Sequence, residues 1–470
     1  MKYIQYELKR AWTTSTTWIA LVFVLVCCVT MLSNISSQHA REEAFGKDLI
    51  IGWGSSAIAR IDNNIQNDLK EGLITKEESI QYRESLQDFK EVYQKFLETD
   101  PNKNWKEYEY LAILNLIYNG EDTKQMINAD NDPYDYLVHE DIFTSLKNKY
   151  LPNKNIVFPY TEAEERSNHT MSNKLYFQGA NYYLQYFDQL YTHDVKPQNR
   201  YAIGSGESVY HYLHLLFPVV LLLVSAVLVF DTFEKDMQSG AIKTMVQAKN
   251  RFTYIKTKVM VSFINILIVC FLPITMIFAG YAMEDHTQGL QTPMLSYQIG
   301  LTSFQQGHNL LKEQQKLKKA QQEGISQIQV EDNYLGMVQY SQISYDPISF
   351  FPDNSLTLIS LGKFLIQSLC LAILSIMFMI SWMNTCMCMF KRKIIGLLGG
   401  GCIMLIGYLL SSPANTSIMG MLNPFQYLDP TLIIGGTSAY TFLYGVCVLL
   451  VYSVILLIIA FQIFKRKDIA

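Results

Sequence analysis

The sequence is short of charge. Charged residues make up 17% of its 470 positions, whereas a soluble chain of this size approaches about 25%. Val259–Met283 and Ala439–Phe464 contain no charged residue, while residues 36–207 contain 46. This unevenness excludes a single soluble globule, a disordered chain and a fibrous repeat. It indicates an integral membrane protein that carries a sizeable aqueous domain.

Cysteine is absent from the two long hydrophilic regions, residues 36–207 and 284–354. A disulfide framework is therefore excluded from them. The pair Cys386 and Cys388 could bind a soft metal or carry a lipid, but we favour small packing residues inside the membrane. All eight cysteines fall in the apolar segments: Cys27, Cys28, Cys270, Cys370, Cys386, Cys388, Cys402 and Cys447.

The common sequence motifs for nucleotide binding, metal binding and nucleophilic catalysis are also missing. The two Gly-Lys pairs, at 46–47 and 362–363, are not followed by Ser or Thr, so the chain has no Walker-type phosphate loop. It has neither a His-Glu-x-x-His metal motif nor a Gly-x-Ser-x-Gly nucleophile elbow. No apolar segment carries the several charges of an ion-coupled pump. We therefore expect no catalytic residue, cofactor or metal in this chain, and any work it does must be powered from elsewhere.

Six apolar segments are long enough to cross a bilayer core, which takes about 20 residues. The 36-residue Ser355–Phe390 leaves room for an interfacial lead-in before its span. Before the last span, residues 411–438 carry Asp429 as their one charge, with helix-interrupting prolines and a Gly-Gly pair. We expect this stretch to form a re-entrant hairpin. The six segments are Thr13–Leu32, Tyr210–Phe230, Val259–Met283, Ser355–Phe390, Ile394–Leu410 and Ala439–Phe464.

The charge balance predicts the orientation. The net charge is +2 in residues 1–12, +3 in 231–258, +3 in 391–393 and +2 in 465–468. In contrast, it is −10 in residues 36–207 and −4 in 282–354. The positive-inside rule places both termini and the basic loops in the cytoplasm. The expected fold is an all-α membrane protein of the cell membrane, with six transmembrane helices, a mostly helical extracellular domain and the hairpin before the last span.

The expected parts follow from these boundaries. Residues 1–35 hold an interfacial helix and the first span, which we interpret as an uncleaved anchor rather than a signal peptide. An extracellular domain follows, and then spans two and three around a cytoplasmic loop, a second extracellular insertion and the last three spans. The corresponding ranges are 1–35, 36–207, 208–283 with the loop 231–258, 284–354, and 355–470 with the hairpin 411–438.

Local patterns predict helices in both outer regions. Thr75-Lys76-Glu77-Glu78 is a capping box at a helix start. Pro133 suits the first turn of another helix. The expected elements are helices at Trp105–Ile117, Asp132–Lys149, Asn181–His193 and Phe304–Gly324, and a short strand at Ile156–Tyr160.

Two groups of residues could contact a substrate. Tyr182, Tyr186 and Phe187 belong to an aromatic cluster that could line a cleft, although packing in the domain core or on the membrane is the favoured alternative. Lys363 is expected one or two turns inside the outer membrane surface, where it could either snorkel outward or face an interior cavity and meet an acidic substrate group.

A histidine pair begins the second span. His211 and His214 would share a face with Glu207, a geometry that could bind a metal or respond to pH. Interfacial packing of the rings is the interpretation that we favour.

The loop between spans two and three carries the most specific pattern. Acidic residues leave the second span, a glycine opens a short helix with one apolar face, and basic residues begin the third span. Such a helix could dock a soluble partner, or lie on anionic lipid. The residues concerned are Glu234, Asp236, Gly240, Ile242, Met245, Arg251 and Lys258.

This loop resembles that of type-2 ATP-binding-cassette (ABC) exporter permeases, in which acidic residues, a Gly-Thr-Ile/Leu helix, an Arg and a Lys occupy these places. Ala241 stands where Thr is usual, and Lys249-Asn250 replaces a Pro-Ser-like pair. The six spans, the amphipathic segment Tyr3–Trp12 and the hairpin also match, whereas the large outer insertions depart from the compact family pattern.

The resemblance implies a permease subunit without an ATP site of its own. A separate cytoplasmic ATPase would bind ATP and Mg²⁺, dock on the loop and drive outward export of an amphipathic cargo such as a peptide, bacteriocin or lipid-like molecule. The other partners would be a second permease copy or a sister permease and membrane lipid, with no nucleic acid. The alternative is a non-transporting membrane sensor or assembly protein whose extracellular domain binds a ligand.

Overall fold

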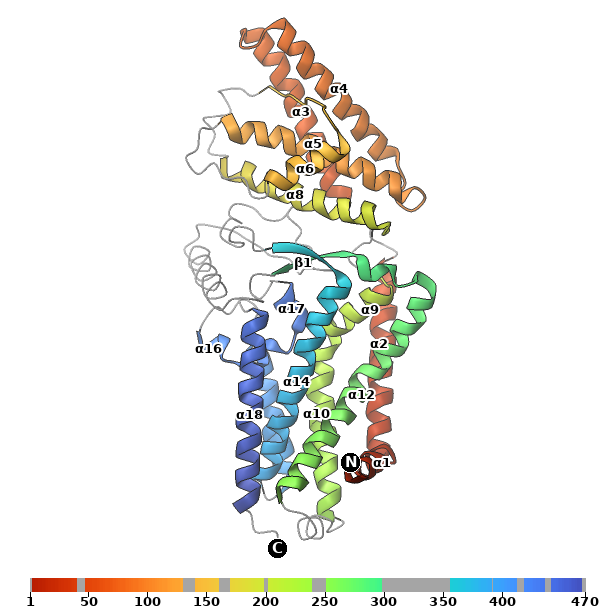
Figure 1. Cartoon of the computed structure of the whole chain (residues 1–470), viewed down its shortest axis with the longest axis vertical. Coiled ribbons are helices and arrows are strands. Elements are labelled where there is room, and N and C mark those ends of the chain that lie inside the picture. Colours follow the sequence, from red (N-terminus) through yellow and green to blue (C-terminus); the bar gives the residue numbers. More distant parts are fainter. Residues whose placement is uncertain are drawn as a thin grey trace.

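The computed structural model describes residues 2–39, 47–129, 140–159, 170–197, 202–238, 251–297, 356–390, 392–411, 418–435 and 441–466. Figure 1 shows two parts stacked along the long axis. A bundle of long helices carries both chain termini at one end, here called the proximal end. The distal domain, made of α3, α4, α5, α6 and α8, lies beyond the opposite, distal end of the bundle.

Within the described residues, the bundle contains five helices that are long and apolar enough to cross a membrane. Many large apolar side chains remain exposed on them, among them Phe23 on the first and Ile455 on the last, as expected of lipid-facing surfaces. The chain is therefore a predominantly helical, multi-pass membrane protein. The helices are α2 (Ser15–His39), the continuous α9, η1 and α10 (Ser205–His211, Tyr212–Leu216, Phe217–Gln238), α12 (Arg251–Asp285), α14 (Leu361–Met389) and α18 (Phe442–Arg466).

The segment expected to form the fifth span forms a shorter helix, α15 (Lys393–Leu409), which has 17 residues. Trp382 Nε1 on α14 donates to the Gly400 carbonyl at 3.2 Å, which fixes α15 alongside its predecessor. At 1.5 Å per residue α15 is about 25 Å long, slightly less than a bilayer core of about 30 Å. A sixth crossing therefore stays a prediction.

The stretch before α18, which was expected to be interrupted by prolines, contains three short elements within residues 418–435. Pro424 opens a 3₁₀ helix and Pro430 opens α17, each as the first residue of its element. Tyr427 is fully buried, and its carbonyl accepts from Ser375 on α14 at 3.2 Å. Protein thus shelters this irregular backbone. The elements are α16 (Ile418–Met421), η6 (Pro424–Tyr427) and α17 (Pro430–Ile434).

The distal domain is helical, as predicted. The Thr75 side chain accepts from Glu78 N, and Glu78 accepts from Thr75 N at 2.8 Å, so the capping box forms. Aromatic side chains of α4, α5 and α8 fill its core, with Phe96 stacked on Tyr108 at 5.0 Å between ring centroids. Its helices are α3 (Lys47–Glu71), α4 (Lys76–Glu98), α5 (Trp105–Ala129), α6 (Glu140–Tyr150) and α8 (Thr170–His193).

The short strand expected at Ile156–Tyr160 does not form over its described residues 156–159. This stretch lies among helices and bonds to their side chains, because Phe158 N donates to Gln125 Oε1 at 2.8 Å and Val157 N to Ser85 Oγ at 3.3 Å. Backbone groups that side chains satisfy need no partner strand.

A two-stranded antiparallel sheet lies between the bundle and the distal domain (Figure 1). It pairs β1 (Pro293–Tyr297) with β2 (Leu356–Ser360), from Pro293 opposite Ser360 to Tyr297 opposite Leu356. The apolar lead-in to the fourth span is therefore a strand, and α14 begins at Leu361. The helix expected at Phe304–Gly324 lies outside the described residues, as does the start of the one expected at Asp132–Lys149.

Candidate functional site

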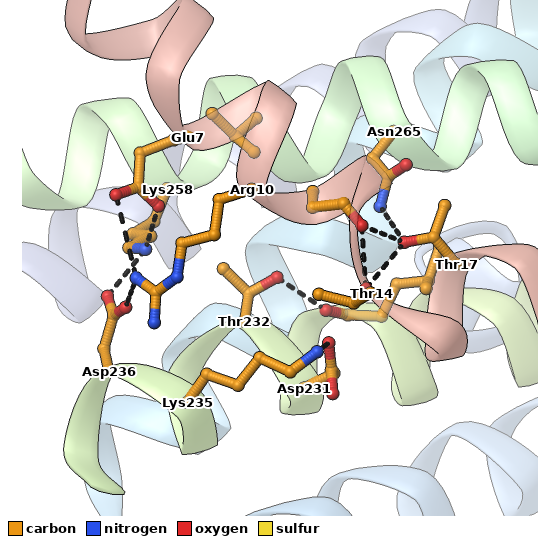
Figure 2. Close-up of a pocket in the computed structure, with 13 residues that line it drawn as sticks. Glu7, Arg10, Thr14, Thr17, Asp231, Thr232, Lys235, Asp236, Lys258 and Asn265 are labelled. Atoms are coloured by element: carbon orange, nitrogen blue, oxygen red, sulfur yellow. Dashed lines mark hydrogen bonds and ion pairs between the residues drawn. The ribbon is translucent and has the colours of Figure 1, made fainter. Parts of the chain in front are cut away.

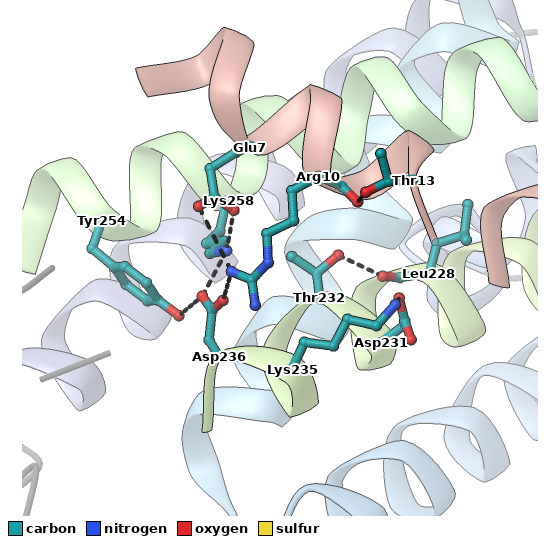
Figure 3. A network of polar contacts seen from close by, with 10 residues as sticks. All are labelled: Glu7, Arg10, Thr13, Leu228, Asp231, Thr232, Lys235, Asp236, Tyr254 and Lys258. Atoms are coloured by element: carbon teal, nitrogen blue, oxygen red, sulfur yellow. Dashed lines mark hydrogen bonds and ion pairs between the residues drawn. The ribbon is translucent and has the colours of Figure 1, made fainter. Parts of the chain in front are cut away.

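A buried ion pair at the proximal end joins α10 and α12, the two helices on either side of residues 239–250. Asp236 lies in the last turn of α10 and Lys258 two turns into α12, with Lys258 Nζ 2.6 Å from Asp236 Oδ2 (Figure 3). The side chains are 0% and 1% exposed. The pair therefore closes the base of the segment that connects these helices, residues 239–250.

The N-terminal helix α1 (Lys2–Trp12) completes this cluster. Glu7 Oε2 lies 2.7 Å from Lys258 Nζ, and Arg10 Nη1 lies 2.7 Å from Asp236 Oδ1. Tyr254 donates its hydroxyl to Asp236 Oδ2 at 2.8 Å. We call these five residues, Glu7, Arg10, Asp236, Tyr254 and Lys258, the charge cluster. It holds two acidic and two basic groups, and such pairing is what makes burial of charge tolerable.

The amphipathic character of α1 explains its position. Glu7 and Arg10 are three residues apart and share one helical face, which turns toward α10 and α12, whereas Tyr6 is 61% exposed. Partial burial lowers the pKa of Arg10, but the attraction of Asp236 and its hydrogen bond raise it overall. The guanidinium is therefore charged throughout the physiological range.

A partly open hollow between α1, α2, α10 and α12 is lined in part by the charge cluster (Figure 2). Its floor is polar, because Asn265 donates to Thr17 Oγ1 at 3.3 Å and Thr17 to the Ala11 carbonyl at 2.9 Å. On its rim, Asp231 pairs with Lys235 and accepts from Thr16 at 3.0 Å. These hydrogen bonds connect the first span, α2, to α1, α10 and α12, the helices that carry the charge cluster.

The other residues of the loop pattern are not part of this cluster. Arg251 donates to the carbonyls of Phe464, at 3.2 Å, and of Lys465, which ties the start of α12 to the end of α18. Glu234 lies half-buried on α10. Gly240, Ile242 and Met245 lie outside the described residues.

The candidate substrate residues are far from this cluster. Tyr186 and Phe187 are 2% and 0% exposed in the core of the distal domain, which favours the packing interpretation over a cleft. Tyr182 lies on α8, and its side chain is outside the described part. Lys363 is exposed at the distal start of α14, where Ser360 caps the helix.

The histidine pair and Glu207 do not converge on one point. Glu207 accepts from Thr292 at 3.3 Å, the His211 ring bonds the Ala202 carbonyl, and His214 faces Asp429. Among the described residues, no three histidine, cysteine or acidic side chains are placed to hold a metal. Cys386 and Cys388 are buried on α14, and Cys386 packs against Gly400.

No family model, curated protein or solved structure matches this chain. What the site does must therefore be argued from its geometry and from the pattern of the loop.

Sequence reasoning missed Glu7, Arg10 and Tyr254 as site residues. The available signal was an i, i+3 pair of opposite charges on an amphipathic helix, but such pairs are usually solvated and contribute little. What distinguishes this pair is that Glu7 is buried against Lys258 of α12, a contact over 251 residues of sequence.

Proposed function

We propose that the chain is the membrane-spanning permease subunit of a type-2 ABC exporter. It would lie in the cell membrane with both termini in the cytoplasm, six crossings and a re-entrant hairpin before the last. The observation that carries this proposal is the charge cluster. Asp236 and Lys258, which the loop pattern singled out, pair in a buried cluster at the base of the loop.

Such a cluster suits the transmission of force. A cytoplasmic ATPase docked on residues 239–250 would push on a loop whose two ends are fastened to each other and to α1. Breaking a buried ion pair is costly, so the loop base, α1 and the adjoining spans would move together. ATP binding and hydrolysis on the partner would then shift the permease between two states. The cargo would be amphipathic, and a second permease would complete the pathway.

The first test is to isolate the tagged full-length protein from its native cells in mild detergent and to identify its partners by mass spectrometry. The proposal expects a stoichiometric soluble ATPase, together with one or two kinds of permease chain. Recovery of the chain alone, or with an extracellular ligand only, would favour a membrane sensor or assembly protein instead.

A second test concerns the loop itself. Gly240→Trp and Glu234→Lys should reduce ATPase recovery at least about tenfold, the effect of losing roughly 1.4 kcal/mol of docking energy. Glu107→Lys, an exposed reversal in the distal domain, is the matched control and should leave recovery unchanged. Normal recovery and normal transport with both loop variants would mean that the loop is not the docking element.

A further inference from the structure

The distal end of the bundle holds an acidic residue that the charge cluster does not use. Asp429 precedes α17 and caps it, since Asp429 Oδ1 accepts from the backbone N–H groups of Thr431 at 3.1 Å and Leu432 at 3.3 Å. An ionisable group placed among membrane-spanning segments is costly unless paired, and it commonly marks function. The other carboxylate oxygen, Oδ2, points to a second partner.

That partner is His214 on the second span. His214 Nδ1 lies 3.2 Å from Asp429 Oδ2 and 2.9 Å from Thr431 Oγ1, and the side chains of His214 and Asp429 are 12% and 15% exposed. The contact joins α17 to η1 (Tyr212–Leu216), one turn of π-helix between α9 and α10. Single π-turns inside α-helices are frequent at functional sites.

The hydrogen bonds determine where the proton lies on the ring. Thr431 has one hydroxyl hydrogen, and it donates that hydrogen to Asp429 Oδ1 at 2.7 Å. Thr431 Oγ1 must therefore accept from His214, so Nδ1 carries a proton in either charge state. A second proton would bind at Nε2, and it would add a positive charge beside Asp429 without disturbing this contact.

We infer that His214 and Asp429 form a proton-sensitive latch between the second span and α17. With His214 protonated, opposite charges hold α17 against η1; with His214 neutral, hydrogen bonds alone remain. Histidine changes charge between about pH 5 and pH 8. This inference goes beyond the proposed export function and stands without it.

Among the described residues, three further titratable groups lie near the latch. The Tyr210 ring stacks on His214 with centroids 5.9 Å apart, and Tyr408 on α15 lies near Asp429. Phenols do not ionise between pH 5 and 8, so neither tyrosine can produce a transition there. His211 lies one turn before His214, and its ring bonds the Ala202 carbonyl at 3.1 Å. Because it is also a histidine, the experiment must exclude His211 as the source of a pH-dependent change.

The test is hydrogen exchange of the full-length protein in lipid nanodiscs, followed in peptides that cover residues 424–434. After correction for the intrinsic pH dependence of exchange, the wild type should exchange about threefold faster at about pH 8 than at about pH 5.5, as expected for loss of one partly exposed ion pair. His214→Gln keeps a donor without the charge and should abolish this difference. His211→Gln, the matched control, should retain it.

A second variant guards against misfolding of the first. Asn is also a good N-cap residue, so Asp429→Asn should keep α17 formed while removing the negative charge. It too should abolish the pH dependence. The latch is wrong if His214→Gln and Asp429→Asn both exchange with the wild-type pH dependence. It is equally wrong if His211→Gln removes that dependence.

Discussion

At the scale of single residues, Lys258 is the centre of the charge cluster. Its ammonium group lies 2.7 Å from Glu7 and 2.6 Å from Asp236, so it pairs with both buried carboxylates. A buried ion pair contributes little net stability, but removal of one partner leaves an uncompensated charge. The variants below test this asymmetry.

Lys258→Met should destabilise the protein by about 3–5 kcal/mol, because two carboxylates remain buried beside Arg10 alone. A thermal unfolding experiment in detergent should show a clear drop in the midpoint. Lys256→Met, an exposed neighbour on the same helix, should change stability by less than about 0.5 kcal/mol. Adding Glu7→Gln to Lys258→Met should restore part of the loss; if it deepens the loss instead, the assigned pairing is wrong.

Glu109 is a second unusual residue, in the core of the distal domain. It is fully buried on α5, and neither carboxylate oxygen accepts a hydrogen bond from a described residue. Burial, with a smaller contribution from Asp194, raises its pKa from 4.5 to about 9. At neutral pH the folded domain therefore holds a protonated Glu109, whereas the unfolded chain has lost that proton.

This difference makes stability depend on pH. Between pH 4.5 and about 9 the folded state binds more protons, so the free energy of unfolding falls as pH rises, by up to about 1.4 kcal/mol per pH unit. Glu109→Gln should flatten the decline and be more stable than the wild type near pH 8. Hydrogen exchange of the full-length protein, read in peptides that cover α5 and α8, measures the free energy of unfolding at each pH. Glu107→Gln, an exposed control, should decline like the wild type.

At the scale of helices, glycine decides how closely α15 approaches α14. A Cβ atom on Gly396 would lie 3.0 Å from the Cys386 carbonyl oxygen, which is backbone and cannot rotate away. Gly401, on the same helix, has nothing within 4 Å of that position. The sequence shows a glycine-rich segment, and only packing distinguishes the contact glycines from the open ones.

Gly396→Leu should therefore cost about 1–3 kcal/mol through overpacking. Gly401→Leu, placed in open space or lipid, should be neutral or slightly stabilising, because glycine is a weak helix former. Thermal unfolding of the two variants side by side measures the difference. Equal stability would place α15 away from α14 and contradict the described contact.

At the scale of the whole molecule, the charge balance predicts which end faces the cytoplasm. Leu73, between α3 and α4, is 60% exposed in the distal domain, and Met389 is 57% exposed at the proximal end of α14. Native cysteines all lie in apolar segments, so an added cysteine can be followed against a low background. Its accessibility reports the side of the membrane.

In intact cells, a membrane-impermeant maleimide should label Leu73→Cys several-fold above the unsubstituted chain. Met389→Cys should be labelled only after the membrane is permeabilised. The reverse result would invert the orientation, and with it the assignment of residues 231–258 to the side of the ATPase.

The sequence alone determined the features that depend on neighbouring residues. The apolar segments, the Thr75 capping box and the proline breaks at Pro424 and Pro430 were all predictable, because hydropathy and backbone chemistry act over one or two turns. The two-stranded β-sheet was not, since its strands are separated by residues 298–355.

Only the tertiary structure decided which charges meet. Glu7 reaches Lys258 across 251 residues, and His214 reaches Thr431 across 217. A charged residue in sequence is compatible with a solvated surface or with a buried pair, and the choice depends on how the helices pack. The physical reason is that burial makes an unpaired charge costly, so packing and charge pairing must be satisfied together.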